Sequence, residues 1–152
     1  MQKYLFKNIS VVNEGEIKII DVLVKGERID RIDKNISVKS AVKEIDGEGK
    51  HLFPGVIDDQ VHFREPGLTH KATIETESRA AVAGGVTTFM EMPNTIPNAL
   101  TMDLLEDKYK IASLTSPANY SFFMGVSNNN AAEVLKVNKR KNEIRSEEHT
   151  SE

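Results

Sequence analysis

The sequence contains no cysteine and no tryptophan, and no apolar run approaches the ~20 residues that span a bilayer. The lack of cysteine excludes disulfides and thiolate ligands, so a metal here would need histidine, carboxylate or amide oxygen ligands. The N-terminus, MQKYLFKNIS, lacks the apolar core of a secretory signal. The formal net charge of -3 is too small to indicate nucleic acid or an anionic membrane as a partner. We therefore expect a cytoplasmic protein.

The 152 residues suit one ordinary domain or part of a larger one, and 39% of them are hydrophobic. Residues 4–13 and 16–25 are rich in β-branched side chains, and a third strand is expected from about Glu27 to Ile32. Residues 34–50 are polar and end in the sequence DGEGK at 46–50, which indicates a turn or short linker. We therefore expect residues 1–52 to form the N-terminal part of a small antiparallel β domain.

From residue 53 onward the pattern alternates between short strands and helices. Strands are expected at the start of this part and over 86–92 and 119–126. Helices are expected over 72–84, from Thr101 to just before Pro117, and after the asparagines at 128–130. This order predicts parallel βαβ units and an α/β fold. A closed barrel takes eight such units and ~250 residues, so we expect residues 53–141 to be part of a longer protein.

The last eleven residues, 142–152, have no apolar period. They end in RSEEHTSE, which resembles the translation of a sequencing-library adapter. We expect a disordered, non-native tail there and give His149 no functional role.

Polar side chains recur at every second residue of the first expected strand of this part: Asp58, Gln60, His62 and Arg64. Side chains two apart on a strand share a face, so the four are expected to project together. Burying such groups is costly unless they pair or bind something. This strand is therefore a candidate site.

Each candidate residue also has a structural interpretation. His62 is either a metal ligand or a hydrogen-bonded structural group. Arg64 offers a forked donor that suits a carboxylate, and the alternative is a salt bridge to Glu65 or Glu75. Asn94, after the second strand, could donate to a substrate oxygen or satisfy its own turn.

Two other histidines are expected to lie outside the chemistry. His70 falls in the loop after the candidate strand or at a helix start. His51 precedes that strand, at the end of a barrel away from the site.

Two stretches together carry a family resemblance: PGVIDDQVHFREPGLTHK and AAVAGGVTTFMEMPNTIP. They closely resemble dihydroorotases of the amidohydrolase superfamily, and the likeness runs from about residue 4 to 141. The resemblance implies a (β/α)8 TIM-type barrel whose first three βα units are present here, preceded by part of a small β-sandwich domain. It also implies a zinc-dependent enzyme of pyrimidine biosynthesis that interconverts dihydroorotate and N-carbamoyl-aspartate.

The resemblance assigns roles by position. His62 matches the second histidine of a metal-binding His-x-His pair, and Gln60 stands where the first belongs, so the first metal site is expected to be weakened or absent. Arg64 and Asn94 match the residues that bind the substrate carboxylate, and Asp58 supports the strand. The bridging ligand, two later histidines and the general base would lie beyond this chain. We therefore expect a fragment that is inactive alone, from an enzyme with one or two Zn²⁺.

Two alternatives stay open. Allantoinases and hydantoinases share the barrel and the cyclic-amide chemistry, but their substrates lack the ring carboxylate that Arg64 and Asn94 would bind. A non-catalytic scaffold that stabilises a partner such as aspartate transcarbamoylase is the other alternative, and Gln60 favours it. The intact protein could also form a homo-oligomer.

Overall fold

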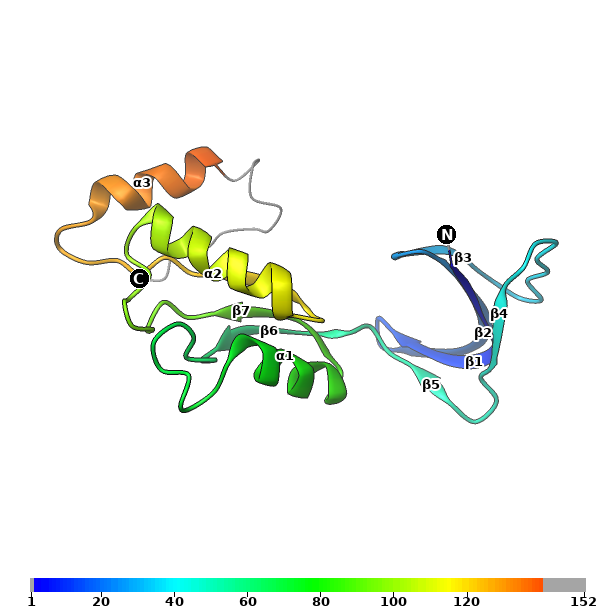
Figure 1. Ribbon diagram of the computed structural model, residues 1–152. Helices are drawn as coiled ribbons and strands as arrows, with labels where there is room; N and C mark the ends of the chain where they lie inside the picture. The colour runs from blue at the N-terminus through cyan, green and yellow to red at the C-terminus, as the bar shows by residue number, and fades with distance from the viewer. Residues whose placement is uncertain (1, 141–152) are drawn as a thin grey trace. The chain divides into compact units, whose positions relative to one another are not determined.

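The computed structural model describes residues 2–140, which divide into two compact units at the boundary between Pro54 and Gly55. Each unit has its own β-sheet, and the chain is of mixed α/β type. Its elements, drawn in Figure 1, are β1 Lys3–Asn13, β2 Glu16–Lys25, β3 Arg28–Asp33, β4 Lys43–Asp46, β5 His51–Leu52, β6 Val56–Val61, α1 Ile74–Ala83, β7 Val86–Glu91, α2 Met102–Thr115, β8 Asn119–Phe122 and α3 Ala131–Arg140.

The first unit is a five-stranded sheet in the order β3-β2-β1-β4, with β5 also paired to β1. The three strands predicted from the sequence are confirmed, and β1–β2 and β2–β3 are antiparallel. The prediction of a wholly antiparallel unit is wrong, because β4 and β5 run parallel to β1. The turn predicted at the end of the polar stretch is confirmed at residues 48–49, but the same stretch also holds β4, which was not predicted. Its four residues, KEID, are mostly exposed at the sheet edge, so no apolar period marks them.

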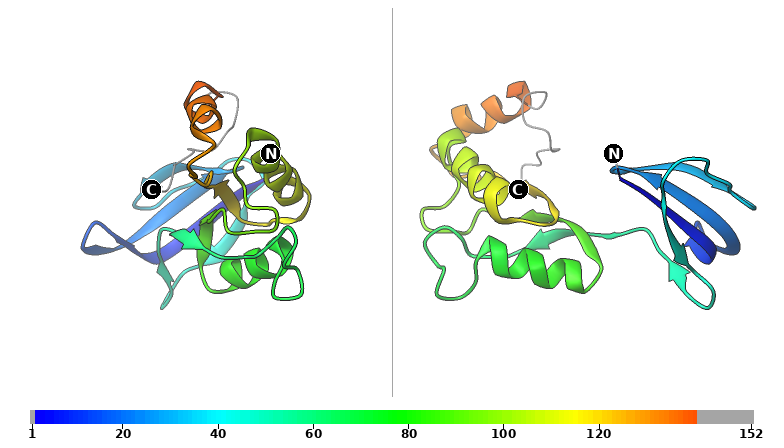
Figure 2. Two further views of the ribbon diagram at one scale, coloured as in Figure 1. Left: turned by 90° about the vertical axis from the view of Figure 1, so that its left-hand side faces the viewer. Right: turned by 45° about the vertical axis from the view of Figure 1, so that its right-hand side comes forward.

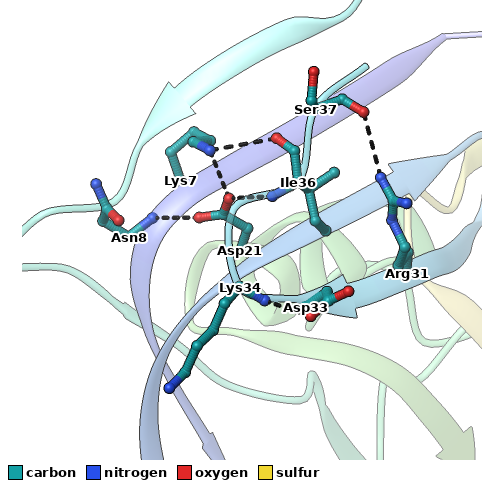
Figure 3. Close-up of polar contacts among 8 residues, drawn as sticks. All are labelled: Lys7, Asn8, Asp21, Arg31, Asp33, Lys34, Ile36 and Ser37. Atoms are coloured by element: carbon teal, nitrogen blue, oxygen red, sulfur yellow. Dashed lines mark hydrogen bonds and ion pairs between the residues drawn. The ribbon is translucent and has the colours of Figure 1, made fainter. Parts of the chain in front are cut away.

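The buried carboxylate of Asp21 stabilises this sheet where β1 is irregular (Figure 3). The pairing of β1 with β2 shifts register between Phe6 and Ile9, and Asn8 there has a φ of 53°. Asp21 of β2 accepts hydrogen bonds from the backbone N–H of Asn8 at 2.9 Å and of Ile36 at 2.8 Å. Lys7 Nζ pairs with the same carboxylate at 2.6 Å. Asp21 therefore ties the irregular part of β1 to the loop after β3.

The second unit is a parallel sheet in the order β6-β7-β8, as the alternating pattern predicted. Helices α1 and α2 lie over one face of it (Figures 1 and 2). One apolar cluster joins the sheet to the helices. It includes the fully buried Phe89, whose ring centroid lies 4.5 Å from that of Phe63. Ile74 of α1 and Leu105 of α2 are fully buried in the same cluster.

Threonine side chains cap the first two helices of the second unit. Thr73 caps α1 through the N–H of Thr76, and the Glu65 carboxylate accepts the N–H of Ile74 at 2.8 Å. Thr101 caps α2, as predicted, and α2 ends before Pro117. The third strand is shorter than expected, because β8 ends at Phe122.

No helix within residues 2–140 is long and apolar enough to cross a membrane. The expected tail at 142–152 lies outside the described residues, as does residue 141.

Candidate functional site

Two turns meet at the carboxyl ends of β6 and β7. We call residues 62–72 the first turn and residues 92–101 the second turn. Because β6 and β7 are parallel neighbours, both turns leave the same edge of the sheet. The N–H of Met92 continues the pairing by donating to the carbonyl of Val61 at 3.0 Å. This edge of the sheet holds three of the predicted site residues: His62, Arg64 and Asn94.

A side-chain hydrogen bond joins the two turns at their exposed surface. His62 Nδ1 lies 3.0 Å from Asn94 Oδ1. Because the amide oxygen can only accept, this hydrogen bond requires a proton on Nδ1 of the imidazole. In a neutral imidazole of that tautomer, Nε2 has the lone pair that a metal ion would bind. The structure thus brings two of the predicted site residues together.

The turns also approach closely through their backbones. The N–H of Ile96 donates to the carbonyl of Pro66 at 3.1 Å. Gly67 has a φ of +83°, and a Cβ on it would lie 2.0 Å from the carbonyl oxygen of Ile96. Glycine is therefore required at residue 67, both for its backbone conformation and for the close contact.

Arg64 lies in the first turn and is half-buried. Its φ is +73°, a region that residues other than glycine seldom adopt, and its N–H donates to the Glu91 carboxylate at 2.9 Å. The two acidic residues expected as alternative salt-bridge partners have other contacts. Glu65 accepts the N–H of Ile74 at the start of α1, and Glu75 pairs with Arg79 at 3.1 Å. Among the residues that the structure describes, the Arg64 guanidinium makes no ion pair.

The shared face was predicted by assuming that side chains alternate regularly along one strand. β6 does not keep this regular alternation beyond Asp58. The pairing of β6 with β7 shifts register between Asp58 and Val61, and β6 ends at Val61. The Asp58 carboxylate accepts the N–H of Gln60 at 3.2 Å, so it is used within its own strand. The expectation that one strand face carries all four polar residues is therefore wrong. Asp58, Gln60 and His62 are nonetheless all exposed.

Beneath the turns lies a buried ion pair that the sequence analysis did not identify. Glu91 Oε2 is 3.0 Å from Lys108 Nζ, and both side chains are 1% exposed. Burial raises the pKa of the Glu91 carboxyl and lowers that of the Lys108 ammonium, and their mutual attraction opposes both changes. One sequence signal could have indicated the pair: Lys108 falls on the apolar face of α2, between Leu105 and Ala112.

The remaining histidines lie apart from this contact. His70 is exposed in the first turn, and His51 is exposed in β5 of the other unit. Within residues 2–140, no three histidine or carboxylate side chains gather into a group that could hold a metal ion. A complete metal site is therefore not formed by the described residues alone.

Comparison with known proteins places the chain in a family. The family described as Dihydro-orotase-like matches residues 49–136, which is more than half of the sequence. A dihydroorotase of Bacillus cytotoxicus is 48% identical over 108 residues, covering 70% of this chain and 25% of that protein. A dihydroorotase of Carboxydothermus hydrogenoformans is 41% identical over 131 residues, covering 84% of this chain and 29% of that protein.

Solved structures give a related result. An L-hydantoinase (dihydropyrimidinase) from Arthrobacter aurescens superposes with a TM-score of 0.85 at 31% identity, covering 91% of this chain and 31% of that one. A D-hydantoinase (dihydropyrimidinase) from Thermus sp. gives 0.74 at 31% identity, covering 88% and 30%. The chain thus spans between a quarter and a third of the length of these relatives. The match over residues 49–136 shows that the chain belongs to the dihydroorotase-like family.

Proposed function

We propose that this chain is the N-terminal part of a metal-dependent dihydroorotase, which interconverts dihydroorotate and N-carbamoyl-aspartate in pyrimidine biosynthesis. The observation that carries the proposal is the contact between His62 and Asn94 across two parallel strand ends, in a chain of the dihydroorotase-like family. It joins a residue suited to a metal with one suited to a substrate oxygen. We use "the whole protein" below for this chain together with the remaining length that its relatives have.

The proposed fold of the whole protein is a (β/α)8 barrel joined to a small β-sandwich domain. Residues 53–141 would be the first three βα units, and residues 1–52 would be the N-terminal part of the β domain. The parallel order β6-β7-β8 supports this proposal, because within the described residues β6 and β8 each have a strand neighbour on one side only. The location of the turns supports it too, since barrel enzymes hold their sites at the carboxyl ends of the strands.

Arg64 and Asn94 would bind the substrate carboxylate. A guanidinium forms paired, charge-assisted hydrogen bonds with a carboxylate. The Arg64 guanidinium forms no ion pair with an acidic side chain of the described residues, so it can bind the substrate. Asn94 uses its oxygen for His62, so its Nδ2 group can donate to the substrate. One amide would thus contact both the substrate and the imidazole.

His62 would be a zinc ligand through Nε2, held in the required tautomer by Asn94. When bound, zinc would lower the pKa of a coordinated water to about 7. Gln60 offers a neutral amide oxygen in place of an imidazole, so one metal position would be weakened. The bridging ligand, the later histidines and the general base would come from the rest of the whole protein, and the present chain would have no activity alone. Asp58 would only support the strand.

Two other functions have specific support. The likeness to hydantoinases and dihydropyrimidinases favours a cyclic amidase whose substrate lacks a carboxylate. Gln60 favours a non-catalytic scaffold for a partner such as aspartate transcarbamoylase. A cytoplasmic location and a homo-oligomeric state also belong to the proposal for the whole protein.

Turnover and metal content of the whole protein distinguish these functions. A dihydroorotase binds zinc and cyclises carbamoyl-aspartate, with little activity on dihydrouracil or hydantoin. The reverse preference would assign the protein to the hydantoinases. Absence of turnover, even in the variant Gln60→His, would exclude the enzyme and favour the scaffold.

A further inference from the structure

Glu91 and Lys108 form a charged pair inside an apolar cluster, and the Lys108 ammonium also lies 5.0 Å from the centre of the Phe122 ring. Removing two charges from water is costly, and replacing such a pair by apolar side chains is often neutral or stabilising. Packing alone therefore does not account for charged residues in this position. Their other contacts indicate what they do.

Each member of the pair also holds the backbone of one turn. Glu91 Oε1 accepts a hydrogen bond at 2.9 Å from the N–H of Arg64 in the first turn. Lys108 Nζ donates a hydrogen bond at 3.1 Å to the carbonyl of Met92 in the second turn. The ion pair at 3.0 Å connects these two hydrogen bonds. A continuous series of polar contacts thus runs from the backbone N–H of Arg64, through the buried Glu91 and Lys108 side chains, to the carbonyl of Met92, two residues before Asn94.

The backbone at Arg64 needs such support. Its φ of +73° is unfavourable for a residue with a side chain, so the first turn would relax if nothing held it. A hydrogen bond from a backbone N–H to a buried carboxylate is charge-assisted and stronger than a neutral one. Glu91 is therefore well suited to hold Arg64 in a conformation that Arg64 would not adopt by itself.

We propose that Glu91 and Lys108 are positioning residues, which fix the two turns so that the Arg64 guanidinium and the Asn94 amide meet the same carboxylate. This inference rests on the proposed function, in which these two residues bind the substrate carboxylate. With side chains only 1% exposed, Glu91 and Lys108 would not contact the substrate themselves. Their effect would be on the placement of groups that do, which decides binding strongly at short range.

The test separates positioning from stability in the whole protein. In Glu91→Leu or Lys108→Met one buried charge loses its partner, so the Tm is expected to fall and substrate binding to weaken. The double variant leaves no unpaired charge, so its Tm returns close to that of the parent. Its KM for dihydroorotate stays raised by about tenfold or more with a smaller change in kcat, because both turns have lost their anchors. A KM that returns together with the Tm would overturn the inference.

A conservative variant and a matched control sharpen the result. Glu91→Gln keeps an oxygen that can accept the N–H of Arg64, so its KM is expected to rise less than that of Glu91→Leu. Equal KM values in these two variants would contradict the role of that hydrogen bond. Asp21→Asn alters a buried paired carboxylate in the other unit, and it is expected to lower the Tm without changing the KM.

Hydrogen exchange of the Arg64 amide gives a readout that does not need activity. The double variant should exchange at this amide about tenfold or more faster than the parent, at a similar Tm. If the parent turns over no dihydroorotate, the proposed function fails, while faster exchange still supports the anchoring of the first turn. Unchanged exchange in the double variant would overturn the inference even in an active enzyme.

Discussion

His62 Nδ1 and Asn94 Oδ1 lie 3.0 Å apart, although the two residues are 32 positions apart in the chain. The contact exists because β6 and β7 are parallel neighbours, so the turns that follow them leave the sheet side by side. In the proposed enzyme, this hydrogen bond links the residue that holds the metal to a residue that holds the substrate. Removing this hydrogen bond should therefore affect both metal binding and substrate binding.

Substitutions of Asn94 should separate these two effects. In the whole protein, Asn94→Ala removes the acceptor of His62 and the donor to the substrate, and kcat/KM should fall about 100-fold. Asn94→Asp keeps an acceptor for His62 but places a negative charge near the substrate carboxylate. Its main effect should therefore be a higher KM. Steady-state kinetics measure both, and a parental KM in Asn94→Asp would contradict the proposed contact with the carboxylate.

Gly67→Ala tests the close contact between the turns. The new Cβ would meet the Ile96 carbonyl oxygen at 2.0 Å, so the turns must move apart. Gly85→Ala is the matched control, because Gly85 also has a positive φ, of +89°, but a Cβ added there would have no atom within 4 Å. We expect Gly67→Ala to lower the free energy of unfolding by about 1–3 kcal/mol more than Gly85→Ala. Urea unfolding measures this difference, and equal losses would show that the contact is unimportant.

Asp21→Asn should change how stability depends on pH. Burial tends to raise the pKa of Asp21, but hydrogen bonds from Lys7, Asn8 and Ile36 outweigh it and hold that pKa below its usual value of 3.8. A carboxyl whose pKa is lower in the folded state contributes stability above the unfolded pKa, and this contribution disappears as the pH falls through the folded pKa.

The parent should therefore exceed Asp21→Asn in unfolding free energy by about 2 kcal/mol at pH 7. The difference should shrink below the unfolded pKa of about 3.8. Urea titrations of the chain at several pH values provide the measurement. A difference that stays constant down to the lowest pH would mean that the charge of Asp21 is not what stabilises the sheet.

Gln60→His tests whether this residue limits metal binding. An imidazole is a stronger zinc ligand than a neutral amide, so the variant of the whole protein should bind more zinc per chain or hold it more tightly. Metal analysis after dialysis against a chelator measures this. Equal zinc retention by parent and variant would indicate that Gln60 does not occupy a ligand position.

Much of the fold could be predicted because its signals are local. β-branched runs marked β1 and β2, Thr101 marked the start of α2, and the change to a helical period marked α1. Strand β4 was not predicted, because four mostly exposed residues at a sheet edge need no apolar pattern. Its parallel pairing with β1 depends on contacts distant in sequence, which no local pattern records.

The location of the predicted site residues at one end of the sheet could be foreseen, but their geometry could not. Strand order brings His62 and Asn94 together, as the parallel βαβ pattern indicated. The left-handed backbone of Arg64 was not foreseen, because arginine carries no signal for it. The Glu91–Lys108 pair was missed because charged residues are ordinarily assigned to the surface, and their burial depends on each other.

The most direct test of the proposed site is the substrate preference of Arg64→Ala in the whole protein, with Arg79→Ala on α1 as the control. The quantity measured is the ratio of kcat/KM for dihydroorotate to kcat/KM for its methyl ester. If Arg64 binds the carboxylate, this ratio falls about 10- to 100-fold in Arg64→Ala and is unchanged in Arg79→Ala. A ratio that Arg64→Ala leaves unchanged would contradict the proposal.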